Sequence, residues 1–350
     1  MEIKQKYRNG VGVDVGTSNI VITRQTEDGT FVSKFHRDML YQLDVSDEAS
    51  DLLDRSDYLY VKTDNKYYIV GEDALRLVNA IGGGTLIRPM RSGILNPELK
   101  SSSELLFFII SALVKEPIVE NECLRFSIPA NPIDRQLDNR FHSMVLQGFF
   151  KKLGYDAKPI NEAMAIGYDC NPIMKTKNEE IPLSGIMMSF GGGMINVALM
   201  FKGIEIHSFS VTSSGDQIDE NVAKVTGLPI SKVLKVKEQG LNLDNIDSTD
   251  RTQIALGIYY DEMLERVTKH VVDYFKDKKT DLEGEVQIIV AGGTSLPDGF
   301  TNRVKAAFDK HEKDVPFKVY EVKRSSTPFY SVVQGACIRA LADTSRKQKD

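Results

Sequence analysis

The sequence has few of the residues that build disulfide scaffolds and zinc sites. Its 350 residues include three cysteines and five histidines. The cysteines, Cys123, Cys170 and Cys337, lie too far apart to form a CxxC pair, and their odd number argues against a disulfide framework. The histidines show no HExxH spacing, which disfavours a zinc site made by the protein alone. We therefore expect a reducing, cytoplasmic environment.

Long apolar runs and a basic excess are missing as well. No run approaches the ~18 residues of a membrane-spanning helix, and the longest, at residues 105–114, contains a serine. The first ten residues are polar and lack the apolar core of a signal peptide. Acidic residues number 49 and basic residues 44, for a net charge of −5. We expect a soluble protein that neither inserts into a membrane nor binds nucleic acid directly.

The motifs of several common nucleotide-binding folds do not occur. The chain has no Walker A loop, no GxGxxG between a strand and a helix, and no kinase HRD or DFG motif. Its length predicts about two domains, and its strands alternate with helices, which is typical of an α/β protein. Helices are predicted at residues 135–153, 247–276 and 330–341, with a polar tail at 346–350.

One short pattern occurs twice. VGVDVGTSNIVI at residues 11–22 and IMMSFGGGMINV at residues 186–197 each predict an apolar strand, a glycine-containing turn and a returning strand. Glycine lets successive N–H groups approach an anion, while Thr17 and Ser18 add hydroxyls and Asp14 suits a hydrated Mg²⁺. A single turn is equally typical of a plain hairpin. Two copies, together with VAGGTS at 290–295, favour a phosphate ligand held between two like halves.

These motifs resemble those of the actin/Hsp70/sugar-kinase ATPase superfamily, and within it the bacterial actins of the MreB, MamK and ParM type. RPMRSGIL at 88–95, NEAMAIG at 161–167, GDQID at 215–219, VKEQ at 236–239 and QGA at 334–336 follow the same order along the chain. The resemblance implies an α/β actin-like fold, with a nucleotide cleft between two RNase H-like halves and small inserted subdomains.

The resemblance also implies a division of the chain into two domains. Domain I would comprise residues 1–158 and 327–350, with a small acidic subdomain at about 33–86. Domain II would comprise residues 159–326, with a helical subdomain at about 216–282. The acidic stretch at 44–57 is either a solvated surface or a contact surface for a partner.

The resemblance assigns roles to individual residues. Glu162 would position the water that attacks the γ-phosphate, and Asp14 would orient the waters of Mg²⁺. The residues implied to bind the nucleotide are Asp14, Gly16, Thr17, Ser18, Asn19, Ser189, Gly191, Gly192, Gly193, Gly215, Asp216, Lys237, Glu238, Gly292, Gly293 and Thr294. The implied ligands are ATP and ADP with Mg²⁺, with GTP as an alternative.

Some of these residues also have simpler interpretations. Glu162 could be a helix N-terminal carboxylate that interacts with the helix dipole. Lys237 and Glu238 could be exposed members of ion pairs along a helix. Gly292 and Gly293 could form an ordinary loop after a buried strand.

The second glycine turn departs from the superfamily pattern. Ser189 stands where the family has aspartate, Met194 where it has threonine, and Asn196 where the Hsp70 pattern has a later aspartate. Replacing a carboxylate by a hydroxyl removes a negative charge near the metal, so Mg²⁺ would depend more on Asp14 and the phosphates. We expect nucleotide binding to persist and hydrolysis to be slower.

The resemblance predicts an ATP-dependent filament protein that polymerises on ATP binding and turns over by hydrolysis. Its expected partners are further copies of itself and an adaptor that links it to DNA or other cargo, for plasmid segregation or organelle positioning. Three alternatives are a cell-shape scaffold of the MreB type, a nucleotide-gated adaptor with little hydrolysis, and a monomeric small-molecule kinase.

Overall fold

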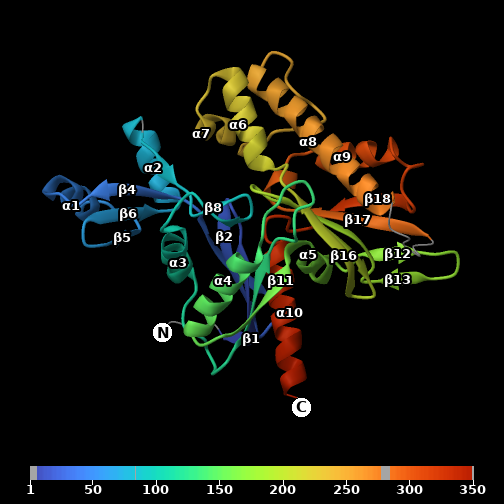
Figure 1. Cartoon of the computed structure of the whole chain (residues 1–350), viewed down its shortest axis with the longest axis horizontal. Helices are drawn as coiled ribbons and strands as arrows, with labels where there is room; N and C mark the ends of the chain where they lie inside the picture. Colours follow the sequence, from blue (N-terminus) through green and yellow to red (C-terminus); the bar gives the residue numbers. More distant parts are fainter. Residues whose placement is uncertain (1–5, 83, 277–283, 349–350) are drawn as a thin grey trace.

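The structure, a computed structural model, describes residues 6–82, 84–276 and 284–348. Parts of four predicted features lie outside these residues: 1–5 of the polar N-terminus, 83 of the small subdomain, 277–282 of the helical subdomain, and 349–350 of the tail. Figure 1 shows two large sheets at the lower centre and the right, with a smaller sheet at the left. None of the described helices is long and apolar enough to cross a membrane.

Five strands form the first sheet, in the order β11-β10-β1-β2-β3. Their bounds are β1 Tyr7–Val15, β2 Asn19–Thr26, β3 Phe31–Arg37, β10 Cys123–Ile128 and β11 Asp156–Asn161. Strands β1, β2 and β3 form an antiparallel meander, and β10 joins β1 and β11 in parallel pairing. The predicted domain boundary between residues 158 and 159 falls inside β11, which belongs to the first sheet. The division of the chain into two domains stays a prediction.

The second sheet repeats this arrangement. The equivalent strands are β14 Gly185–Phe190, β15 Ile195–Phe201, β16 Ile204–Val211, β17 Glu285–Ala291 and β18 Lys318–Arg324. Strands β14, β15 and β16 are antiparallel, whereas β17 pairs in parallel with β14 and β18. A short hairpin, β12 Ile173–Lys175 and β13 Glu180–Pro182, extends the edge. The sequence repeat thus becomes the same hairpin in both sheets, as predicted.

Alternation along the central strands gives each sheet an inner and an outer face. Val11, Val13 and Val15 of β1 join the core formed with helices α3 Ser102–Leu113 and α4 Arg140–Lys152. Gly12 faces helix α10 Ser331–Lys347, because a Cβ on it would lie 2.2 Å from the carbonyl oxygen of Val333. Successive side chains of a strand point to opposite faces, so Asp14 shares the face of Gly12.

Strand β14 shows the same alternation. Ile186, Met188 and Phe190 join a core with helices α6 Gly215–Thr226, α8 Arg251–Lys276 and α9 Phe300–Asp309. Met187 packs instead with helix α5 Glu162–Cys170, and Ser189 shares its face. Asp14 and Ser189 therefore lie near the ends of β1 and β14, on the strand faces that point toward helices α5 and α10 between the two sheets.

Helices α5 and α10 cross each other at very short distance between the two sheets. A Cβ on Gly335 of α10 would lie 1.8 Å from the carbonyl oxygen of Ala165 in α5. Gly12 brings α10 equally close to β1. Glycine is required at such a crossing because any side chain would collide with a neighbouring backbone.

Two insertions flank the upper side of the sheets in Figure 1. The small sheet has the order β5-β6-β4-β7, with bounds β4 Leu40–Asp44, β5 Tyr60–Lys62, β6 Lys66–Val70 and β7 Leu86–Ile87. It carries helices α1 Asp47–Asp54 and α2 Glu72–Ile81, and a hairpin, β8 Met90–Arg91 and β9 Ile94–Leu95, follows it. The acidic stretch at 44–57 contains α1, whose acidic residues are exposed. Helix α7 Ile230–Glu238 lies beside α6 and α8 at the top.

Three predicted helices have different ends in the structure. Helix α4 begins at Arg140 rather than at residue 135, because the Asp138 carboxylate accepts the Arg140 N–H there. Helix α8 begins at Arg251 rather than at 247, because Asp250 accepts the N–H of Thr252. Helix α10 continues through the predicted tail to Lys347. Side-chain acceptors for the first N–H groups decide such boundaries.

Candidate functional site

The two glycine turns have the same hydrogen-bonding pattern and face each other. Gly16 donates to the carbonyl of Asn19 at 3.1 Å, and Gly191 donates to that of Met194 at 3.0 Å. A Cβ on Gly192 would lie 2.0 Å from Ser18 Oγ. A Cβ on Gly193 would lie 2.2 Å from Thr17 Oγ1. Only glycine allows the two turns to approach this closely.

Several N–H groups of these turns are available to a ligand. Within the part of the chain that the structure describes, the backbone N–H groups of Thr17, Ser18, Gly192 and Gly193 donate no hydrogen bond. Unpaired backbone donors that line a hollow require water or an anion as partner. Consecutive N–H groups in a turn are a common way to bind a phosphate.

Asp14 lies beside the first turn and is held by Ser127 of β10. The Ser127 hydroxyl donates to Asp14 Oδ1 at 2.6 Å and accepts the N–H of Val15 at 2.9 Å. Burial raises the pKa of Asp14 to about 6, although the Ser127 hydrogen bond lowers it. A carboxylate that is costly to charge without a partner is well suited to a cation.

Glu162 begins α5 and reaches the second turn. Its Oε2 accepts a hydrogen bond from Asn196 Nδ2 at 2.9 Å and one from Ser189 Oγ at 3.4 Å. Asn196 is oriented by the N–H of Ala130, which donates to its Oδ1 at 2.9 Å. Burial and the nearby charge of Asp14 raise the pKa of Glu162 to about 8. The two carboxyl groups therefore form one coupled acidic pair.

Met194 fills space between the second turn and the β8–β9 hairpin. Its sulfur accepts a hydrogen bond from Ser210 Oγ at 3.4 Å, and a Cβ on Gly93 would lie 2.9 Å from the same sulfur. Met194, which stands where the resemblance implies a threonine, is buried and supplies a thioether for packing rather than a hydroxyl.

The start of α6 lies against the second glycine turn. Gly215 donates to the carbonyl of Gly191 at 3.2 Å, and Asp216 donates to that of Gly192 at 2.9 Å. Arg88 joins this helix to the first turn, because its Nη1 contacts Asp216 Oδ2 at 3.0 Å and its Nη2 donates to the Thr17 carbonyl at 2.7 Å.

The other end of the site is formed by α7 and the loop after β17. Lys237 Nζ contacts Asp219 Oδ2 at 2.6 Å, and burial raises the pKa of Asp219 to about 6 although Lys237 lowers it. Gly292 has a φ of +97°, and its Cβ would lie 2.4 Å from the Phe190 carbonyl oxygen. Gly293 is different, because a Cβ there would meet nothing within 4 Å.

These groups surround one cavity of about 360 Å³. Every predicted site residue lines it except Gly215, whose Cα faces the Thr294 side chain instead. The lining residues that lie outside the quoted motifs include Phe35, Arg37, Leu234 and Phe329, while Arg88 and Asp219 belong to motifs but were not predicted as site residues. Phe35 and Phe329 meet edge to face with ring centroids 5.3 Å apart, which gives the cavity an apolar wall.

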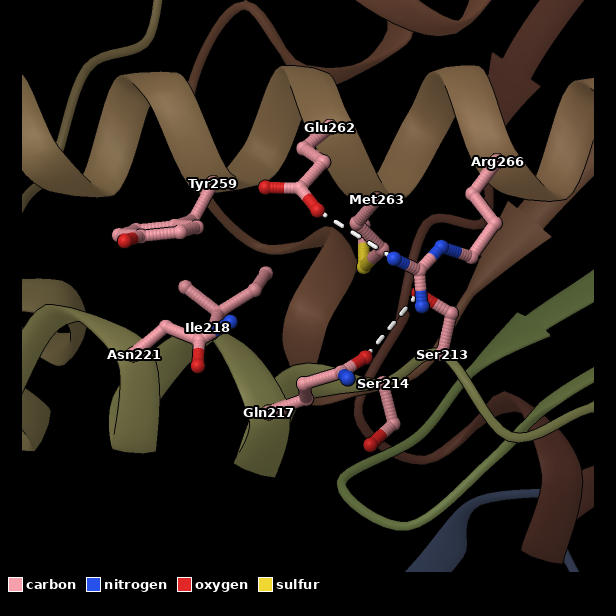
Figure 2. Close-up of a pocket in the computed structure, with 9 residues that line it drawn as sticks. All are labelled: Ser213, Ser214, Gln217, Ile218, Asn221, Tyr259, Glu262, Met263 and Arg266. Carbon is pink, nitrogen blue, oxygen red and sulfur yellow. Dashed lines mark hydrogen bonds and ion pairs between the residues drawn. The ribbon is translucent and has the colours of Figure 1, made fainter.

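A second hollow lies between α6 and α8 and is shown in Figure 2. Its volume is about 10 Å³, and the Arg266–Glu262 ion pair, 3.3 Å long, lies along its α8 side. It has room for about one water molecule. A third hollow, of about 490 Å³, is lined by residues that include Lys158 and Arg339 and contains neither glycine turn. The cavity between the two glycine turns is the candidate ligand site because it gathers their unpaired N–H groups and two buried carboxyl groups.

The arrangement matches that of known solved structures over nearly the whole chain. One is described as a MamK double helical filament, at 16% identity and a TM-score of 0.67, covering 95% of this chain and 98% of that one. Another is MreB 5 of Spiroplasma citri bound to AMPPNP, at 15% identity and a TM-score of 0.65, covering 97% of each chain. The ethanolamine utilization protein EutJ of Carboxydothermus hydrogenoformans, at 12% identity, covers 96% and 93% with a TM-score of 0.51.

These similarities identify the fold as that of the bacterial actin-like proteins, as the sequence motifs predicted. No curated protein sequence matches the chain. A family model described as Volactin matches residues 10–340, so the chain belongs to the volactin family.

Proposed function

We propose that the chain binds ATP in the 360 Å³ cavity, hydrolyses it, and assembles into filaments. The unpaired N–H groups of Thr17, Ser18, Gly192 and Gly193 are the observation that supports a polyphosphate ligand most directly. They come from both sheets, so a ligand that accepts from all of them holds the two halves together. Further support is that MreB 5 of Spiroplasma citri is described as bound to AMPPNP and, in a second structure, to ADP.

The donor set fits a Mg²⁺ ion that accompanies the phosphates. Among the described residues no three His, Cys, Asp or Glu side chains gather to hold a metal, so protein ligands alone do not form its site. Asp14 and Glu162 supply buried carboxyl groups with raised pKa values, and Ser189 supplies a hydroxyl. Hard cations prefer such oxygen donors and retain several waters. Mg²⁺ would neutralise charge on the β- and γ-phosphates.

Glu162 is the group best placed to orient an attacking water. Phosphoryl transfer depends mainly on positioning and charge stabilisation, and Asn196 and Ser189 fix the carboxyl group at the second turn. Ser189 replaces a metal-side carboxylate, so we propose slow hydrolysis.

Assembly into filaments is proposed from the fold and from the description of MamK as a double helical filament. Head-to-tail contacts that do not close produce an open polymer. Cytoplasmic cargo positioning or plasmid segregation, through an adaptor, is the corresponding cellular role. Sedimentation of the purified chain with ATP and Mg²⁺ tests assembly. A protein that stays in the supernatant and phosphorylates a small molecule would support the alternative, a monomeric kinase.

Gly293→Ala provides a direct test of the nucleotide site. Gly293 lines the cavity, and the added methyl group meets no protein atom within 4 Å, so the nucleotide-free protein should keep its melting temperature. If adenosine passes over this residue, affinity for ATP should fall about tenfold or more. Isothermal titration measures the change.

Gly148→Ala is the matched control, because a Cβ on this exposed glycine of α4 also meets nothing within 4 Å. It should leave ATP affinity unchanged. Equal affinities for wild type and both variants would contradict the proposed placement of the nucleotide.

A further inference from the structure

The guanidinium group of Arg37 reaches across the cavity from one wall to the other; its two-pronged contact with Glu238 is called the fork below. Arg37, the last residue of β3, directs Nη1 and Nη2 to the two carboxylate oxygens of Glu238, at 3.3 and 3.0 Å. Its Nε contacts Glu72 Oε2 at 2.7 Å. Glu72 begins α2 beside the small sheet, and Glu238 ends α7. One guanidinium group thus connects strand β3 of the first sheet, helix α2 beside the small sheet, and helix α7.

The position of Glu238 makes this contact more than an incidental surface pair. The C-terminal end of a helix carries partial negative charge, which disfavours a carboxylate there. Arg37 compensates for this charge with a two-pronged contact, the geometry in which guanidinium and carboxylate match best. The Arg37 side chain is only 18% exposed, against 46% for Glu238, so the arginine is held in place and the glutamate retains access to solvent and cavity.

The pair also stands at the apolar end of the cavity. Arg37 and Phe35 are two residues apart on β3 and share a strand face, and Phe35 meets Phe329 beside the loop of Gly292. A further ion pair, from Arg88 to Asp216, lies beside the two glycine turns. Two ion pairs therefore join segments that line the cavity, one near the glycine turns and one near Phe35.

We infer that Arg37 is a positioning residue that holds Glu238 against the ribose and must release it before nucleotide can leave. The inference rests on the proposed nucleotide site. Both groups line the cavity, so an occupant that contacts Glu238 is enclosed while the fork is intact. The fork bonds two oxygens of Glu238, and each oxygen has a second lone pair for a ribose hydroxyl. Release of nucleotide then depends on separation of the pair.

The rate of ADP release tests this inference. Protein loaded with radiolabelled ADP and Mg²⁺ is mixed with excess unlabelled ADP, and retained label is followed over time. Arg37→Ala should accelerate release about tenfold and leave the association rate within about twofold, because loss of a local contact acts mainly on dissociation. Arg37→Lys, which keeps the charge but not the fork, should lie in between. In wild type, release should accelerate with salt, since an accessible pair is screened.

Two comparisons separate positioning from a general loss of structure. Arg76→Ala removes an exposed ion pair with Asp73 on the same helix, α2, and should release ADP at the wild-type rate. Wild type should prefer ADP to 2′,3′-dideoxy-ADP, and Arg37→Ala should lose most of that preference. Melting curves without nucleotide establish that the variants fold.

The inference is overturned if Arg37→Ala keeps the wild-type release rate and ribose preference, or if Arg76→Ala accelerates release equally. A wild-type protein that retains no ADP would overturn the proposed function, and this inference with it.

Discussion

Glu162→Gln should abolish most ATP hydrolysis and leave ATP binding nearly unchanged. We expect the turnover rate to fall about 100-fold, the lower range for removal of a positioned acid–base group. The glutamine keeps the shape of the side chain and can still accept from Asn196. It cannot carry the negative charge that orients and polarises a water. Phosphate release under single-turnover conditions, with affinity from titration, measures the two quantities separately.

Glu104→Gln is the matched control for this prediction. Glu104 also lies in the first turn of a helix, α3, and is exposed. If Glu162 were only a carboxylate that interacts with a helix dipole, both variants would lose about 0.3–1 kcal/mol of stability and neither would change hydrolysis. Loss of hydrolysis in Glu162→Gln alone supports the catalytic assignment. Equal turnover in both variants would remove Glu162 from the mechanism.

The same pair of variants should differ in how their stability depends on pH. Burial raises the pKa of Glu162 in the folded protein from 4.5 to about 8. Below 4.5 the group is protonated in both folded and unfolded chains, and its contribution to stability is complete. As pH rises to about 8, the unfolded chain gives up its proton readily and the folded chain does not, so stability is lost.

Glu162→Gln should therefore gain stability relative to wild type as pH rises. Without nucleotide, the difference in unfolding free energy should move in favour of the variant by at least about 1 kcal/mol between pH 5 and pH 8. Urea unfolding at several pH values measures this difference. Asp38, whose pKa burial raises to about 7, titrates in both proteins and cancels, whereas Asp14 is coupled to Glu162, so the difference reports the titration of this pair. A constant difference would show that Glu162 is charged throughout.

The sequence could predict the part of the cavity around the two glycine turns because that part is built from short local patterns. A strand, a glycine turn and a returning strand place Asp14 and Thr17 by alternation and turn geometry alone. The second copy places Ser189 and Gly192 in the same way. Long-range proximity then followed from the resemblance, which supplied the arrangement of the two halves that the local patterns do not contain.

The remaining cavity residues depend on pairings between distant segments. Arg37 reaches the site because Asn19 pairs with it across β2 and β3, a register that the turn at Asp28 and Gly29 could have indicated. Phe329 had no such signal, and Asp219 belonged to the GDQID motif without being singled out as a site residue. Asp219 becomes part of the cavity only when α6 packs beside α7, and Phe329 only when the Pro328 carbonyl accepts the N–H of Gly292. Such contacts are set by tertiary packing, which no local motif records.

Gly335→Ala should destabilise the protein strongly, because its Cβ would make the closest approach to another atom of any described glycine. The new Cβ would lie 1.8 Å from the Ala165 carbonyl oxygen, so α5 and α10 have to move apart. They cannot do so freely, because Gly12 holds α10 at similarly short distance from β1. Overpacking of a rigid contact costs about 1–3 kcal/mol, and we expect a loss at the upper end of that range.

The sign of the change in unfolding free energy distinguishes Gly335, at the helix crossing, from an ordinary glycine inside a helix. Replacing glycine by alanine inside a helix normally stabilises it by about 1 kcal/mol, and Gly148→Ala in α4, with no atom near its Cβ, should show this gain in urea unfolding. Gly335→Ala should show the opposite sign. Because α5 also carries Glu162, the displaced helix should in addition weaken ATP hydrolysis, although Gly335 itself does not line the cavity. A stabilising Gly335→Ala would mean that the two helices are not in contact at this point.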